Sequence, residues 1–385
     1  MRAALRHVVL GGHGHGGGDA GQHGRIHIDG LVFRDEQGAI WPWKGFTAFT
    51  LYLLWLIGKG AAVDQPVSDW LSLRHRPNTL RVLGMVNSFA RLHPQDWTGY
   101  YDELQPFVRY LFSKWAIRVE FVIFADSGDI MPDAGQQNDH ARRVADLIGD
   151  EPNVFLEVAN EPSQHSNLSG GDERAYEIYH MIKRADRMVA TGAGDGSFSG
   201  DFVTVHTPRD LEWPRKAKDI LDVRDIAHDP SVADEPMGAS EVWQEGKRDT
   251  NPRNFADYAA VAQLVGAGST FHSDSGILAR PLQPIQRECA EAFFAAADWV
   301  PSPAQIEIFN RGGTVPGCNW THAPGDAESP CQHDDSIEVR SYGKILEPFY
   351  YVSQVQTKRD QPKACAGWQA DQSGPSTGLT RFRRA

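Results

Sequence analysis

Short apolar segments alternate with longer amphipathic ones along the first 300 residues of the chain. Residues 97–115 and 138–148 have the 3.6-residue periodicity of helices, and Pro152 and Asn153 interrupt the chain just before a new apolar run. Four apolar segments have the length of buried strands, and their first residues are 34, 40 and 36 positions apart: 44–50, 78–85, 118–125 and 154–160. This alternation predicts βα units that build a parallel sheet.

The second half of this region is less regular but contains four more candidate strands, at residues 188–191, 201–206, 231–234 and 269–272. Residues 192–200 join the fifth and sixth strands and are too rich in glycine for a full helix, so this crossover is expected to be abbreviated. Helices are expected at residues 255–265 and 286–299. Eight strands with intervening helices predict an α/β fold, a (β/α)8 TIM barrel over residues 25–300.

Both ends of the chain differ from the predicted barrel. Residues 1–24 contain many glycines, with His13, His15 and His23 among them, and indicate a flexible arm, to which no function is assigned. Residues 25–33 alternate and precede the turn cluster at 34–38, which predicts an N-terminal β-hairpin closing one end of the barrel. Residues 301–385 are rich in Pro, Gly and Asp, with possible strands at 336–340 and 349–356. They are expected to form a small C-terminal β-containing extension packed on the barrel.

Composition excludes several classes of protein. A net charge of −12 and the lack of a basic stripe argue against nucleic acid as a partner and favour a neutral substrate. The longest apolar stretch, Phe46 to Ile57, is too short to cross a membrane. The first ten residues lack the apolar core of a secretory signal, so the protein is expected to be cytoplasmic, or secreted if a signal has been removed. The sequence does not indicate an oligomeric state.

Four cysteines lie in the last quarter of the chain, at spacings that match no zinc pattern. Cys318 and Cys331 bracket a loop rich in Pro and Gly. They would form a disulfide in an oxidising compartment, and the alternative is that both are buried free thiols.

Polar side chains follow several of the predicted strands, where a (β/α)8 barrel carries its chemistry. Two glutamates facing each other across about 5–5.5 Å can cleave a glycoside with retention, one as nucleophile and the other as acid and then base. Asn160 is placed to hydrogen-bond the sugar 2-hydroxyl, and Arg81 would keep a nucleophilic carboxylate ionised. The full set of strand-end candidates is Arg81, Asp126, Asn160, Glu161, His206, Glu235 and His272.

Asn160-Glu161-Pro162, at the end of the fourth strand, resembles the Asn-Glu-Pro motif of clan A glycoside hydrolases, which include the family 5 cellulases and mannanases. Asn78-Thr-Leu-Arg81 resembles the clan's strand-two arginine segment, His206 falls where a strand-six histidine is usual, and residues 30–46 resemble the clan's lead-in to strand one. The resemblance covers roughly residues 25–300. It implies a retaining glycosidase with Glu161 as acid/base, a glycoside or oligosaccharide substrate, and no metal or organic cofactor.

The clan's pattern for the nucleophile, a proline followed five residues later by glutamate, fits this sequence twice. Glu235 follows Pro230, and Glu241 follows Pro236. Glu235 is preferred because residues 231–234 make the better strand; Glu241 remains open, with Glu245 as a lesser alternative.

Two positions depart from the clan's pattern and leave the substrate class open. Thr207-Pro208 follows His206 where many members have a tyrosine two residues beyond the histidine, and His272 ends the eighth strand where a tryptophan is common. His272 would either substitute by hydrogen bonding or be satisfied by backbone partners. Asp126 is expected to be a helix N-cap or turn residue.

Tryptophans near the predicted strand ends and loops are candidates for stacking on sugar rings: Trp41, Trp43, Trp213 and Trp243. Most tryptophans belong to protein cores. Trp243, in the loop after the seventh strand, is therefore the one expected to contact substrate.

Two other functions remain possible on the sequence alone. One is a catalytically impaired barrel that binds carbohydrate. The other is a metal-dependent hydrolase that uses His206, His228, His272 and Asp229. Sugar, linkage, endo or exo action, and hydrolysis versus transfer to another acceptor are not indicated.

Overall fold

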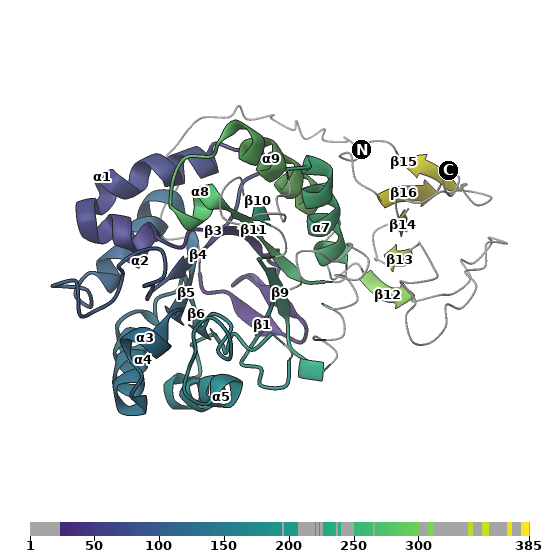
Figure 1. Ribbon diagram of the computed structural model, residues 1–385. Coiled ribbons are helices and arrows are strands. Elements are labelled where there is room, and N and C mark those ends of the chain that lie inside the picture. The colour runs from purple at the N-terminus through teal and green to yellow at the C-terminus, as the bar shows by residue number, and fades with distance from the viewer. Residues whose placement is uncertain are drawn as a thin grey trace, which may run out of the picture.

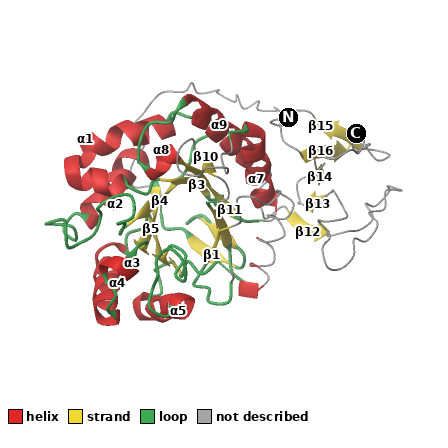
Figure 2. Cartoon of the chain, in the orientation of Figure 1, coloured by secondary structure: helices red, strands yellow, loops and turns green. Residues whose placement is uncertain are grey.

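The computed structural model describes residues 24–194, 196–206, 226–235, 250–264 and 266–299, four further positions between residues 220 and 239, and five strands beyond residue 300. Helices surround a central sheet of parallel strands (Figure 1; Figure 2). The chain therefore has the expected α/β architecture, and the strands of the barrel lie between Lys44 and Ser273.

Eight parallel strands form the barrel, in the hydrogen-bonded order β7-β6-β5-β4-β3-β11-β9-β8, and a short β10 pairs with β11. All eight lie where the sequence predicts them, although several are shorter than expected. Their bounds are β3 (Lys44–Thr47), β4 (Thr79–Leu83), β5 (Arg118–Phe124), β6 (Val154–Ala159), β7 (Val189–Ala190), β8 (Val203–His206), β9 (Ser231–Asp234), β10 (Gly238–Ala239) and β11 (Gly268–Ser273). The predicted (β/α)8 barrel is confirmed.

The helices cover the outside of the sheet because each has one apolar face. In α2, buried side chains at 104, 107, 108 and 111 repeat at helical spacing. Helix α2 begins at Leu104, later than the residue 97 expected from the periodicity, because residues 97–103 form turns. The helices are α1 (Leu51–Leu71), α2 (Leu104–Trp115), α3 (Ser127–Ile130), α4 (Ala134–Ile148), α5 (Gly171–Ile182), α7 (Pro252–Leu264), α8 (Asp274–Ile277) and α9 (Pro284–Trp299).

No ladder is present between β7 and β8 in the described part of the barrel, so the sheet closes incompletely there. The described residues of 192–200 form no helix, which confirms the expected abbreviated crossover. Gly192 has φ +85°, and a Cβ at this position would lie 1.6 Å from the carbonyl oxygen of Ala159. Only glycine allows the chain to turn this close to the end of β6.

An N-terminal hairpin is present, but its turn lies earlier than expected. Strands β1 (His27–Asp29) and β2 (Val32–Arg34) pair around Gly30, and the predicted turn at residues 34–38 makes a second reversal instead. Gly30 takes the left-handed conformation (φ +58°) that such a tight turn requires.

The hairpin closes the amino end of the barrel with an aromatic cluster, here called the aromatic plug, of Phe33, Trp43, Phe155 and Phe202. The Trp43 ring lies 4.7 Å from that of Phe155 and 5.6 Å from that of Phe202, and Phe33 packs 5.3 Å from Trp43. All four side chains are almost completely buried. The expectation that the hairpin closes one end is thus met by direct packing.

The five strands beyond residue 300 pair with one another in an antiparallel sheet, in the order β12-β13-β14-β16-β15. They are β12 (Ile306–Asn310), β13 (Glu338–Ser341), β14 (Phe349–Ser353), β15 (Trp368–Asp371) and β16 (Leu379–Arg384). The C-terminal β-containing addition is therefore present, and its packing on the barrel stays a prediction. Residues 1–23 and the Cys318–Cys331 pair lie outside the described residues.

None of the helices described in the structure has a stretch that is both long enough and apolar enough to cross a lipid bilayer.

Candidate active site

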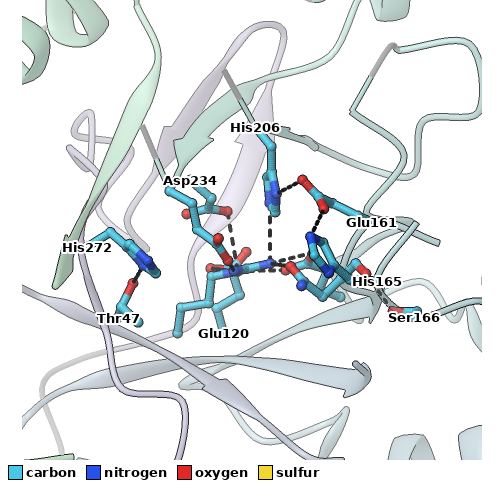
Figure 3. Close-up of polar contacts among 12 residues, drawn as sticks. Thr47, Glu120, Glu161, His165, Ser166, His206, Asp234 and His272 are labelled. Atoms are coloured by element: carbon cyan, nitrogen blue, oxygen red, sulfur yellow. Dashed lines mark hydrogen bonds and ion pairs between the residues drawn. The ribbon is translucent and has the colours of Figure 1, made fainter. Parts of the chain in front are cut away.

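The carboxyl ends of the barrel strands bring together most of the residues singled out in the sequence. Arg81 lies on β4, Asn160 and Glu161 follow β6, His206 ends β8, and Glu235 follows β9. Figure 3 shows Glu161 and His206 in contact, with the acidic side chains of Glu120 and Asp234 beside them. The predicted site is therefore one continuous group of polar side chains.

Arg81 is at the centre of this group and is completely buried. Its Nε and Nη2 donate to the two carboxylate oxygens of Glu157, at 3.0 and 2.9 Å, and its Nη1 donates to Glu235 Oε1 at 2.7 Å. Nη2 also contacts Asn160 Oδ1 at 3.0 Å and His206 Nε2 at 3.4 Å. A guanidinium can make this many contacts because it carries five N–H groups in a rigid plane.

Two more buried acids lie close to the same guanidinium. Glu120 and Asp234 are completely buried and lie 3.7 and 3.6 Å from Arg81 Nε. Burial and the neighbouring carboxylates hold the pKa of Glu120 well above its usual range, and burial raises the pKa of Asp234 to about 6. One positive charge thus faces four acids, and the surroundings of Glu120 favour its protonated form.

This acidic group does not suit a metal ion. Carboxylate oxygens of Glu120, Glu157 and Asp234 lie within 4.8 Å of one another. Arg81 lies among them and already provides the positive charge that they need, so a bound cation would be repelled by the guanidinium.

The alternative metal set is also separated by the fold. His206 lies at the carboxyl end of β8, whereas His228 and Asp229 precede β9 and so lie at the amino end of the barrel. His228 is exposed, and Asp229 accepts a hydrogen bond from Ser199 at 2.9 Å. The structure does not bring this set of ligands together.

Glu161 is held by two histidines. His206 Nδ1 lies 2.9 Å from Glu161 Oε1, and His165 Nε2 lies 3.0 Å from Glu161 Oε2 (Figure 3). Burial would raise the pKa of the Glu161 carboxyl, but the close contacts with His165 and His206 outweigh it and hold that pKa well below its usual range. The same contact raises the pKa of His165.

Both candidate catalytic glutamates have left-handed backbone conformations, with φ +48° at Glu161 and +49° at Glu235. Residues other than glycine are uncommon in this region, and such strain concentrates at functional sites. Here each strained residue comes directly at the end of a barrel strand. The strained backbone redirects each carboxylate as the chain leaves the sheet.

His272 lies beside the site on β11 and is 2% exposed. Its Nδ1 is 3.0 Å from Thr47 Oγ1, and its ring packs 5.6 Å from Phe49.

Other sequence candidates lie elsewhere. Asp126 Oδ2 accepts from the backbone N–H groups of Asn87 and Ser88 at 2.6 and 2.8 Å, so it ties two loops together and gives its helix no side-chain N-cap bond. Trp41 and Trp43 pack at the amino end, away from the strand ends that carry the site. Glu241, Trp243, Glu245 and Trp213 lie outside the described residues.

Four residues of the site were not identified from the sequence: Glu120, Glu157, His165 and Asp234. Glu120 and Glu157 had a detectable signal, because each is a charge with apolar neighbours on both sides in a strand, which is costly without a partner. The contact between His165 and Glu161 could not be predicted without the conformation of the turn after β6.

No family model matches the sequence, and no curated protein matches it. Solved structures do match. A glycoside hydrolase aligns over 94% of this chain and 97% of its own, with a TM-score of 0.58 and 14% identity. A glycoside hydrolase family 5 structure from Bacteroides vulgatus aligns over 94% of each chain, with a TM-score of 0.56 and 13% identity.

A β-glucanase from Saccharophagus degradans, solved in complex with cellotetraose, aligns over 71% of this chain and 93% of its own, with a TM-score of 0.51 and 14% identity. At such low identity the similarity concerns the fold. The chain therefore has the (β/α)8 barrel fold of these glycoside hydrolases, as the resemblance in its sequence led us to expect.

Proposed function

We propose that this chain is a retaining glycoside hydrolase that cleaves a β-linked glycoside, with Glu235 as nucleophile and Glu161 as acid/base. One observation carries the proposal: His206 and Arg81 connect the two glutamates in a single chain of contacts. His206 contacts Glu161 through Nδ1 and Arg81 through Nε2, and Arg81 contacts Glu235. Two carboxylates at one barrel end, each with its own charged partner, can divide the two roles of glycoside cleavage.

Glu235 is suited to attack the anomeric carbon. Its carboxylate is 14% exposed, and its contact with Arg81 at 2.7 Å favours the ionised form. In the first step Glu235 forms a bond to the anomeric carbon, while Glu161 gives a proton to the departing glycosidic oxygen. In the second step Glu161 takes a proton from water, which displaces Glu235 and releases the sugar.

Asn160 is suited to hold the sugar. Its Oδ1 accepts from Arg81, which fixes the orientation of the amide and leaves the NH2 group to donate. In the proposed complex this group hydrogen-bonds the sugar 2-hydroxyl, a contact that strengthens in the transition state. The cellotetraose complex of the structurally similar β-glucanase makes β-linked glucosides a sensible first choice of substrate.

The proposal is tested with a panel of aryl β-glycosides and with Glu161→Gln and Glu235→Gln. We expect Glu235→Gln to lose at least about 10⁴-fold in kcat, because no covalent intermediate can form, and Glu161→Gln to lose about 10²–10⁴-fold on substrates with poor leaving groups. A 2-fluoro glycoside should label Glu235, as identified by mass spectrometry of peptides. Labelling at Glu241 instead would reassign the nucleophile, and full activity of Glu161→Gln would exclude the acid/base assignment.

One observation favours a second candidate, a barrel that binds sugar without cleaving it. The low pKa of Glu161 means that the free protein holds this residue as a carboxylate, whereas the first step needs a proton on it. Saturable binding of oligosaccharides by calorimetry, with no labelling and no turnover on the panel, would select this candidate.

A further inference from the structure

His165 is held over Glu161 by a well-defined turn. The backbone N–H of His165 donates to the carbonyl oxygen of Glu161 at 3.1 Å, and the N–H of Ser166 donates to that of Asn160 at 3.1 Å. Ser166 Oγ donates further to the carbonyl oxygens of Asn160 and Phe124, at 2.6 and 2.8 Å, and Ser166 is completely buried. The imidazole therefore belongs to a fixed loop that starts at the acid/base itself.

The two histidines on Glu161 differ in their access to water. His206 Nδ1 lies 2.9 Å from Glu161 Oε1, and its side chain is 9% exposed. Burial and Arg81 lower the pKa of His206, but the hydrogen bond to Glu161 and the charges of Glu235 and Glu161 outweigh them and raise it. His206 therefore orients the carboxylate from a buried position, where it exchanges protons with water poorly.

His165 has the opposite surroundings. Its side chain is 70% exposed and can exchange protons with water, while Nε2 remains 3.0 Å from Glu161 Oε2. Besides Glu161, the charges that act on it come from Glu235 after β9 and Asp126 after β5, and both are carboxylates. Three carboxylates around one accessible imidazole favour its protonated form.

We propose that His165 is a positioning residue that stores the proton which Glu161 delivers to the leaving group. The inference rests on the proposed glycosidase function. It explains how a carboxylate that is ionised in the free protein can serve as a general acid. The proton waits on the imidazole and reaches the carboxylate when a glycosidic oxygen is present to receive it.

The proton balance closes over one turnover. In the first step the His165 Nε2 proton passes to Glu161 Oε2, and a carboxyl proton passes to the glycosidic oxygen. The C–O bond breaks with its electron pair on that oxygen as Glu235 bonds to the anomeric carbon. In the second step water bonds to the anomeric carbon and the bond to Glu235 breaks. The water proton passes to Glu161 and back to His165, so one water is consumed and both residues return to their starting states.

The test compares His165→Gln with wild type, using His27→Gln as matched control. Glutamine can still hydrogen-bond Glu161 but cannot carry the proton, and His27 is an exposed histidine on β1 at the opposite end of the barrel. For an aryl glycoside with a poor leaving group we expect His165→Gln to lose about 10–100-fold in kcat. For a dinitrophenyl glycoside, which departs without protonation, the loss in the glycosylation step should stay below about 3-fold.

The pH profile of kcat/KM distinguishes proton storage from a merely structural role of His165, because a structural role would leave that profile unchanged. The alkaline limb of kcat/KM reports loss of the acid's proton, so in His165→Gln it should move toward lower pH by about one unit or more. In parallel, the His165 ring resonances of wild type should titrate at higher pH than those of Glu161→Gln. An active enzyme whose leaving-group dependence and alkaline limb are both unchanged by His165→Gln would overturn this inference alone. A wild type that hydrolyses no glycoside and takes up no fluoro-glycoside label would overturn the proposed function.

Discussion

Arg81 is the residue on which the charge balance of the barrel depends. Its single positive charge faces Glu120, Glu157, Asp234 and Glu235, all within 3.7 Å of the guanidinium. Glu157 binds it through both oxygens, whereas neither oxygen of Glu120 has a hydrogen-bond partner. The two glutamates therefore differ in their contacts with Arg81 although they lie side by side, and they should respond differently to the same substitution.

We expect Glu120→Gln to raise the free energy of unfolding by about 1–3 kcal/mol at pH 7. The folded pKa of Glu120 lies above its unfolded value, so between the two the folded state binds more protons, and stability falls as the pH rises above the ordinary pKa of a glutamate. Glutamine removes this titration while keeping the shape of the neutral acid. Urea denaturation between pH 4 and 8 measures the effect, and the gain should vanish near pH 4.

Glu157→Gln is the matched comparison. It removes one partner of a buried, bidentate ion pair, which should cost about 3 kcal/mol at pH 7. If Glu120→Gln and Glu157→Gln lowered the free energy of unfolding by similar amounts, the expected difference between the two glutamates would be contradicted.

The site was predictable from the sequence where a residue follows or ends a strand or matches a known motif. Glu161 and His206 lie at the ends of apolar runs, the carboxyl ends of parallel strands meet at one place, and Arg81 was found through its resemblance to the clan's strand-two segment. Glu120 and Glu157 contact Arg81 because of the register between β4, β5 and β6, in which Arg81 pairs with Glu120 and Val122 with Glu157. Such a register is a property of the assembled sheet.

At the scale of elements, α4 has a well-defined start that follows from its sequence. Asp133 is its N-cap, and its side chain accepts from the backbone N–H of Gln136 at 3.0 Å. This bond satisfies one of the amide groups that a helix leaves without a partner at its first turn. The cap fixes where the helix begins, so it also fixes which side chains face the sheet.

We expect Asp133→Ala to lower the free energy of unfolding by about 1 kcal/mol. The control is Asp139→Ala on the same helix, whose side chain is 85% exposed and makes one distant contact with Arg142 at 3.9 Å. That change should stay within about 0.5 kcal/mol. Thermal unfolding of both variants compares them directly, and equal effects would show that the cap bond contributes nothing.

The barrel strands were predicted from the sequence, whereas helix α1, which follows β3, was not. Helix α1 was missed because the apolar run from Phe46 crosses from β3 into the helix, and the N-cap residue Thr50 makes no side-chain cap bond. The helical pattern is also interrupted at Lys59, whose φ of +54° breaks α1 into two parts. An apolar run of this kind does not distinguish strand from helix without the packing around it.

At the scale of the whole molecule, the gap between β7 and β8 makes the barrel depend on its short glycine-rich crossover. The backbone of Asp201 bonds to Val189 at 2.8 Å, and Gly192 turns against the end of β6. Asn160 and Glu161 follow that end directly. A substitution in the crossover should therefore displace Glu161 without contacting it.

We expect Gly192→Ala to destabilise the protein by about 2–4 kcal/mol, because alanine is strained at φ +85° and its methyl group would overlap the Ala159 carbonyl. Any folded fraction should have reduced kcat through displacement of Glu161. Gly194→Ala is the control, since a Cβ there meets nothing nearer than 3.8 Å, and it should behave as wild type. Unfolding curves and initial rates for the pair test this, and a harmless Gly192→Ala would show that the close approach is not required.

The aromatic plug closes the amino end of the barrel and leaves the carboxyl end for the candidate site. Among the described residues, Phe33, Trp43, Phe155 and Phe202 fill the amino end of the barrel. In the proposed reaction, glycoside, water and products would therefore all pass through the carboxyl end. The departing alcohol then has to clear the same opening that the incoming water uses. In the proposed reaction, water and any other alcohol in that opening compete for the same glycosyl-enzyme intermediate. The ratio of hydrolysis to sugar transfer would therefore depend on which of them reaches the intermediate first.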